Sequence, residues 1–204
     1  MESLRKIIDR IRLYIEITHI SDIARRYFVK NGMDGSMTVL GIILGSWAAR
    51  VENPYIIVMA GLGACLAMGV SGLFGAYITE KAERRKIIKD LEEAMLSDLE
   101  GSLQQNASEF VPTLAALVDG LSPALTATIS LIPFIMSMIK IMSIWDSYFV
   151  SIILTFGTLF ALGLYLGHIA RERMGRIWIY GLQMVAAGVV IAFVVFILGG
   201  AQTA

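Results

Sequence analysis

The sequence contains a single cysteine, and this scarcity excludes several classes of site. One thiol, Cys65 within an apolar run, supports neither a framework of disulfides nor a thiolate metal cluster. The chain also lacks the Cys–His spacings of zinc sites, the glycine-rich loops that hold phosphates and the motifs of nucleic-acid binding. We therefore expect no prosthetic group and no nucleic-acid partner.

Charged residues are scarce as well. They make up 17% of the 204 residues, whereas 56% are hydrophobic, and the mean hydropathy is +0.70. A soluble domain of this length cannot bury so much apolar surface, so the composition predicts an integral membrane protein. The first thirty residues are charged throughout, and we expect no cleavable signal peptide there.

Five apolar runs predict an all-α membrane protein with five transmembrane helices. These lie at about residues 33–49, 55–79, 114–139, 148–169 and 177–198. The chain then divides into a cytosolic amphipathic segment, a first transmembrane hairpin, a cytosolic charged helical insertion and a three-helix transmembrane region. Their bounds are residues 1–30, 31–79, 80–112 and 113–204.

Two of these segments lie outside the predicted membrane. Residues 1–28 carry an apolar stripe opposite basic residues, which predicts an amphipathic helix. This helix packs either on a membrane surface or on the protein's own cytosolic part. Residues 80–105 keep a helical stripe and predict a helical extension of the second span, which we expect to break at residues 106–112.

The basic residues predict the orientation. All lysines and arginines except Arg50 and Lys140 lie in the N-terminal segment, in residues 80–112 or in the turn at residues 171–176. The positive-inside rule then places the N-terminus in the cytosol and the C-terminus outside. The compact length and the absence of a targeting sequence favour a prokaryotic cell membrane.

Asp34 is the first candidate site residue, because it stands beside Gly35 at the start of the first span. A carboxylate at the membrane boundary is costly unless water, a cation or a partner group compensates its charge. Two interpretations are open: Asp34 caps the helix N-terminus, or it binds an ion. Further along the span, Gly41 and Gly45 form a small-xxx-small pair that permits close helix contact.

A weak internal similarity adds further candidates. Asp34-Gly35 opens the first span as Asp119-Gly120 opens the third, and a Gly-x-Tyr sequence ends the second span (Gly75) and the fourth (Gly163). A true duplication gathers carboxylates and an imidazole at the cytosolic ends of four helices, a set that suits Mn²⁺ or Fe²⁺. The residues are Asp34, Glu80, Glu83, Asp119 and His168, with the thioether of Met37 nearby. The alternatives are chance similarity, an interfacial histidine and a methionine used for packing.

The position of Arg26 eight residues before Asp34, a second span rich in small residues and the charged extension after it resemble the vacuolar iron transporter family. The resemblance implies a homodimer that moves Fe²⁺ or Mn²⁺ out of the cytosol against protons, with the aspartate matching Asp34 in its pore. It also implies that cytosolic glutamates collect the metal; here these are Glu92, Glu93 and Glu100. The alternative for these glutamates is a solvated charged face. Ala64 and Gly72 stand where plant-type members carry a glutamate and a methionine.

These observations favour a transporter over an enzyme, with a divalent ion as cargo and the lipid bilayer and a second copy of the chain as partners. Asp34 would coordinate the ion, and Asp119 or Glu80 would act as second ligand or proton carrier. Two alternatives stay open. One is a metal-dependent membrane enzyme that acts on a phosphate-containing headgroup at the cytosolic face. The other is a structural or regulatory membrane protein, in which arginines neutralise the aspartates.

Overall fold

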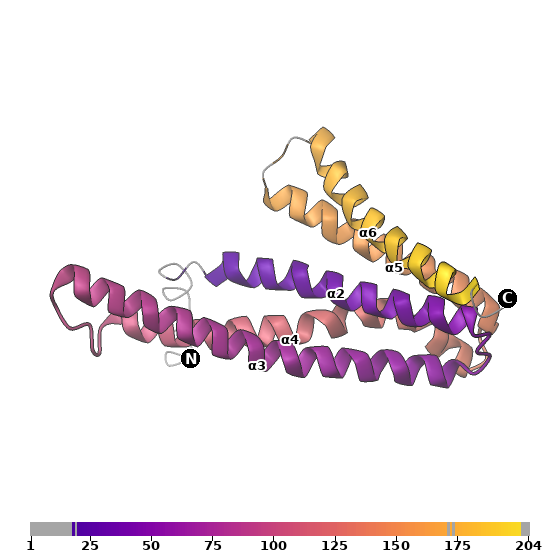
Figure 1. Ribbon diagram of the computed structural model, residues 1–204, viewed down its shortest axis with the longest axis horizontal. Helices are drawn as coiled ribbons and strands as arrows, with labels where there is room; N and C mark the ends of the chain where they lie inside the picture. Colours follow the sequence, from indigo (N-terminus) through magenta and orange to yellow (C-terminus); the bar gives the residue numbers. More distant parts are fainter. Residues whose placement is uncertain (1–17, 19, 171, 173, 201–204) are drawn as a thin grey trace, which may run out of the picture. The chain divides into compact units, whose positions relative to one another are not determined.

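The computed structural model describes residues 18, 20–170, 172 and 174–200, and this part of the chain consists of α-helices without strands (Figure 1). The all-α class is confirmed for these residues. The predicted amphipathic helix lies mostly outside the described residues, and its last residues belong to α2. The helices are α2 (Ile20–Ala48), α3 (Pro54–Met95), α4 (Leu103–Met138), α5 (Ile144–Ile169) and α6 (Met174–Gly200).

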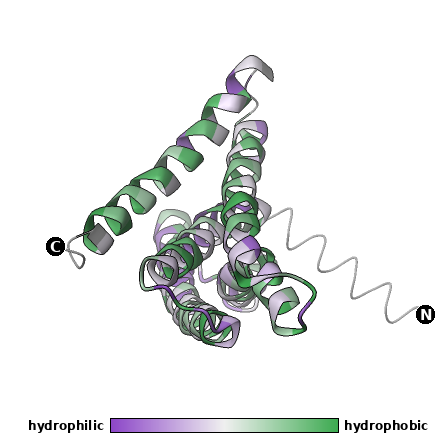
Figure 2. Ribbon diagram, turned by 90° about the vertical axis from the view of Figure 1, so that its right-hand side faces the viewer, coloured by the Kyte–Doolittle hydropathy of each residue, from purple (hydrophilic) through white to green (hydrophobic). Residues whose placement is uncertain are grey.

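Four of the described helices are long and apolar enough to cross a membrane: α3, α4, α5 and the Gly175–Gly199 part of α6. Figure 2 shows α6, the helix that ends at the C-terminus, as hydrophobic along most of its length. The first predicted span is helical within α2, but α2 is not among the four. Asn31 and Asp34 lower the hydropathy of the central part of α2. The structure thus supports a multi-pass membrane protein.

The turn between α3 and α4 differs from the sequence-based expectation. α3 continues as a helix beyond the second span to Met95, and α4 begins at Leu103, so the predicted break at residues 106–112 is wrong. Pro112 suggested that break, but it lies in the third turn of a continuous helix. The chain instead turns at residues 96–102, where Gly101 adopts a φ of 72°, a conformation that glycine takes without steric cost.

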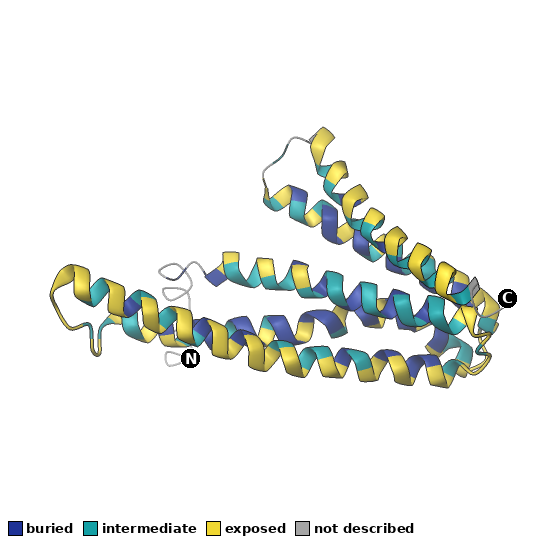
Figure 3. Ribbon diagram, viewed as in Figure 1, coloured by how far each residue is buried: buried dark blue, intermediate teal, exposed yellow. Residues whose placement is uncertain are grey.

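The chain forms two compact units, and α2, α3 and α4 each contribute to both. The first unit contains the chain up to Phe28 together with Val70–Leu121. In it, the second half of α3 and the first half of α4 form a helical hairpin. The apolar side chains buried there include Ala76, Ile88, Ala107, Val111 and Ala115. Figure 3 shows that most residues along the second half of α3 are exposed.

The second unit, Val29–Gly69 with Ser122–Ala204, contains the larger apolar core. The rings of Phe134 and Tyr148 meet edge to face, with centroids 5.0 Å apart. Tyr148 Oη also donates a hydrogen bond of 2.8 Å to the carbonyl oxygen of Val51, which ties α5 to the turn between α2 and α3. α5 and α6 lie side by side (Figure 1). A Cβ on Gly163 would lie 2.4 Å from the Tyr180 carbonyl oxygen, so glycine permits this close approach.

Within the second unit, α3 contacts both α2 and α4. Thr38 of α2 donates a hydrogen bond of 3.5 Å to the sulfur of Met68. Gly61 packs against α4, because a Cβ there would lie 2.8 Å from Leu131 Cδ2. The two glycines paired by the proposed duplication also differ, because Gly163 is tightly packed and nothing lies within 4 Å of a Cβ on Gly75.

Candidate functional site

Glu80 lies where the apolar part of α3 gives way to its charged part, and its residue surface is only 6% exposed. Tyr27 Oη donates a hydrogen bond of 3.1 Å to Glu80 Oε1. On the other side, Arg84 Nε forms an ion pair with Glu80 Oε2 at 3.9 Å, one turn further along α3. A buried carboxylate needs such partners, since its desolvation is costly. The phenol and the guanidinium thus orient Glu80.

A second carboxylate, Asp119 of α4, is buried in the same unit at 5% exposure. It lies against α3 at Gly72, where a Cβ would be 2.9 Å from Asp119 Oδ2. Both carboxylates affect the titration of Tyr27. The pKa of Tyr27 is raised to about 12, mainly by burial, next by the charge and hydrogen bond of Glu80, and then by the charge of Asp119. This unit therefore gathers two buried carboxylates and one neutral phenol.

Asp34 belongs to the second unit and lies half-buried inside α2. The N-cap interpretation of Asp34 is wrong, because α2 begins at Ile20 and a capping residue must stand at the helix start. Within its own unit, no described residue forms a hydrogen bond or ion pair with the Asp34 carboxylate. Helix capping therefore does not account for the negative charge at this position.

The helix that carries Asp34 is held closely against α4. A Cβ on Gly35 would lie 2.6 Å from the backbone Cα of Pro123. One turn earlier, the carbonyl oxygen of Gly32 accepts hydrogen bonds from Thr126 Oγ1 at 2.7 Å and from Ser36 Oγ at 3.0 Å. The small and hydroxyl-bearing residues around Asp34 thus fix the backbone on which it stands.

The remaining predicted site residues are more accessible. Glu83, Glu93, Glu100 and His168 are exposed, and Met37 is half-buried in α2. Glu92 is engaged in structure, since its Oε1 accepts the backbone N–H of Leu99 at 3.1 Å across the α3–α4 turn. In the described part of the chain, no group of three or more His, Cys, Asp or Glu side chains is placed to hold a metal ion. Glu80 and Asp119 share one unit, while Asp34, Met37 and His168 belong to the other.

Three residues of this arrangement were not among the predicted site residues. Arg84 had a local signal, because it follows Glu80 by four residues and such pairs meet on one helix face. Tyr27 had none, because 53 residues separate it from Glu80. Gly72 was noted as standing where plant-type members carry a methionine, and in the structure it makes room for Asp119.

Comparisons with known proteins extend these observations. A model of the VIT family matches residues 25–95, a stretch that includes Tyr27, Asp34, Glu80 and Arg84. An uncharacterised protein of Methanocaldococcus jannaschii is 32% identical over 178 residues, which cover 85% of this chain and 87% of that protein. No solved structure matches the chain significantly.

Proposed function

Since the chain belongs to the VIT family, we propose that it is a membrane transporter of divalent metal ions. The cargo in this proposal is Fe²⁺ or Mn²⁺, which leaves the cytosol of a prokaryotic cell in exchange for protons. The transporter is a homodimer with cytosolic N-termini and outer C-termini across five spans, α2 forming the first. Transport, and not catalysis, is its activity.

The observation that carries this proposal is the position of Asp34. Its carboxylate lies inside a continuous helix, where the backbone N–H groups are already used and no described residue of its unit pairs with it. A visiting cation compensates such a charge. The structural alternative requires Arg25, Arg26 or Arg171 to do so. Arg25 forms its ion pair with Asp22, on the same helix turn, and Arg171 lies outside the described residues.

The carboxylates also suit the proposed chemistry. Carboxylate oxygens are preferred ligands of Mn²⁺, and they lose that capacity when they are protonated. Protons that enter from the outer side would therefore release the metal. Glu80 and Asp119, which are buried with Tyr27, are the proposed proton carriers.

The test is Mn²⁺ uptake by vesicles that contain the purified chain, measured with and without a pH gradient. We compare Asp34→Asn with Glu52→Gln, which removes one negative charge from an exposed residue between α2 and α3. Since changes even outside the ligand shell reduce metal affinity 10–100-fold, Asp34→Asn should slow uptake at least about tenfold. Glu52→Gln should leave it unchanged. Equal uptake by both variants, or uptake that ignores the pH gradient, would contradict the proposal.

A further inference from the structure

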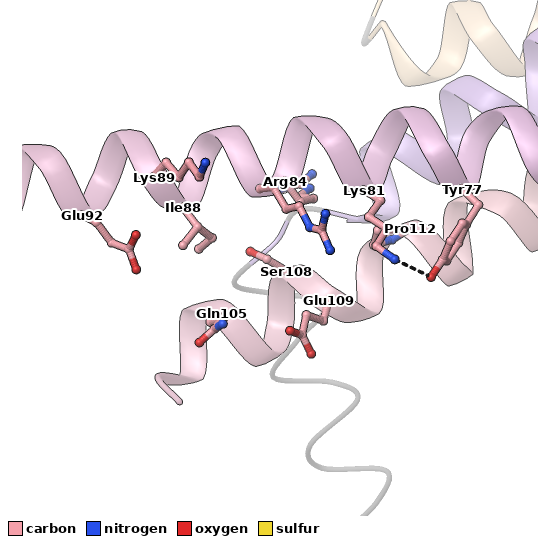
Figure 4. Close-up of a pocket in the computed structure, with 11 residues that line it drawn as sticks. Tyr77, Lys81, Arg84, Ile88, Lys89, Glu92, Gln105, Ser108, Glu109 and Pro112 are labelled. Atoms are coloured by element: carbon pink, nitrogen blue, oxygen red, sulfur yellow. Dashed lines mark hydrogen bonds between the residues drawn. The ribbon is translucent and has the colours of Figure 1, made fainter. Parts of the chain in front are cut away.

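A pocket of about 730 Å³ lies within the first unit, between the second half of α3 and the first turns of α4 (Figure 4). Pockets of about 300–1,000 Å³ accommodate small organic ligands. Its α3 wall carries Lys81, Arg84, Arg85 and Lys89, and its α4 wall carries Ser108 and Glu109. Arg84 also pairs with Glu80, a proposed proton carrier, whereas Lys81, Arg85 and Lys89 have no place in the proposed transport path.

Two of the described residues that line the pocket are acidic, Glu92 and Glu109, and Arg84 also pairs with Glu80. Glu92 is held at the turn between α3 and α4, since its Oε1 accepts the backbone N–H of Leu99. Like charges three and four residues apart on one helix repel each other. An anion in the pocket would relieve this repulsion.

Arg84 gives the pocket an anchor. Its Nε is buried and has no hydrogen-bond partner among the described residues, because Glu80 Oε2 lies at 3.9 Å, too far for a hydrogen bond. A buried donor without an acceptor is costly. Figure 4 shows Arg84 and Lys81 extending from α3 toward α4, with Lys81 Nζ 3.4 Å from Tyr77 Oη. Both cations therefore lie where a ligand between the helices would meet them.

We propose that this pocket binds a phosphate-bearing anion, with Arg84 as the anchor and Lys81 and Lys89 as additional positive charges. The planar guanidinium matches the oxygens of a phosphate group, and lysines add attraction without fixed geometry. Two sources carry this chemistry: the headgroup of an anionic lipid and a soluble phosphate compound. Tyr77 lies at the end of the apolar run of α3, a position at which a headgroup can reach the pocket. The proposal is independent of metal transport.

The test is calorimetric titration of the purified full chain in a neutral detergent with three probes. They are dioctanoyl phosphatidylglycerol, dioctanoyl phosphatidylcholine as the zwitterionic control, and inorganic pyrophosphate. The variants are the double variant Lys81→Gln/Lys89→Gln and Arg84→Lys. The matched control is Lys86→Gln, which removes a charge from an exposed position of α3 that does not line the pocket.

We expect Lys81→Gln/Lys89→Gln to bind whichever anionic probe the unmodified chain binds about tenfold more weakly, since each substitution removes a charge-assisted contact. Arg84→Lys should also weaken binding, because lysine lacks the fork, while Lys86→Gln should bind as the unmodified chain does. Binding of phosphatidylglycerol alone assigns the site to lipid, and binding of pyrophosphate alone assigns it to a soluble ligand. Binding of both supports the shared chemistry. Failure of both anionic probes to bind, equal binding of phosphatidylcholine, or equal weakening by Lys86→Gln would overturn the proposal.

Discussion

Gly35 of α2 lies so close to Pro123 of α4 that a Cβ on the glycine would be 2.6 Å from the proline Cα and 2.7 Å from its carbonyl oxygen. Backbone atoms on the α4 side cannot move aside as the end of a side chain can. The glycine next to Asp34 is therefore required by helix packing. The Asp-Gly pair thus combines a packing residue with a carboxylate that packing does not explain.

Gly35→Ala should destabilise the protein by about 1–3 kcal/mol, because the added methyl group forces α2 and α4 apart. The matched control is Gly45→Ala in the same helix, where nothing lies within 4 Å of a new Cβ. That change should be neutral or stabilising by up to about 1 kcal/mol, because alanine is the better helix former. Unfolding of the purified variants by increasing amounts of a denaturing detergent measures both. Equal stability of the two variants would refute this close contact.

Gly72→Ala should reduce metal transport, because the new Cβ would lie 2.9 Å from Asp119 Oδ2 and the carboxylate would have to move. Stability should fall as well, since the backbone carbonyl oxygen of Asp119 would lie 3.3 Å from the new Cβ. Gly75→Ala, three residues further along α3, meets open space and serves as the control. Vesicle uptake of Mn²⁺ by the two variants provides the measurement. Unchanged uptake by Gly72→Ala would argue against a transport role for Asp119.

Tyr27 should make stability depend on pH in the alkaline range. The pKa of Tyr27 is about 12 in the folded protein, whereas that of an ordinary tyrosine is about 10. Its stabilising contribution is complete below pH 10 and is lost as the pH rises through 12. Between pH 9 and pH 11, the free energy of unfolding should therefore fall more steeply for the unmodified chain than for Tyr27→Phe. Tyr55→Phe, at an exposed residue, should follow the unmodified chain, and parallel curves for all three would rule out this contribution.

Glu92→Ala should open the turn between α3 and α4, because the backbone N–H of Leu99 loses its acceptor. A hydrogen bond of this kind is worth about 1 kcal/mol, so the amide of Leu99 should exchange its hydrogen about fivefold faster. Glu93→Ala changes the neighbouring exposed residue and should leave this exchange unchanged. Hydrogen exchange followed by mass spectrometry distinguishes the two. If neither variant alters exchange at the turn, Glu92 does not support it.

The apolar runs predicted the helices well, because a run long enough to cross the bilayer leaves the backbone little choice but to form a helix. The predicted run at residues 148–169, for example, lies within α5, Ile144–Ile169. Helix ends were predicted less well. Pro112 suggested a break, although α4 continues through it, and the α2 helix was expected to begin near Asp34 rather than at Ile20.

The candidate site was predicted in part. The cost of a carboxylate at the membrane boundary singled out Asp34, and the weak internal similarity added Glu80 and Asp119. Their partners depend on contacts between distant segments, such as Tyr27 with Glu80, and no local pattern predicts such contacts. Glu92 illustrates the converse, because its acidic neighbourhood suggested metal capture while its carboxylate accepts a backbone N–H.

The central claim is that a divalent ion meets the Asp34 carboxylate, and anomalous scattering from Mn²⁺-soaked crystals of the unmodified chain and of Asp34→Asn tests it most directly. We predict an anomalous peak at coordination distance from the Asp34 carboxylate that is lost in Asp34→Asn. A peak that persists in the variant, or manganese found only at exposed glutamates such as Glu83 and Glu93, would contradict the claim.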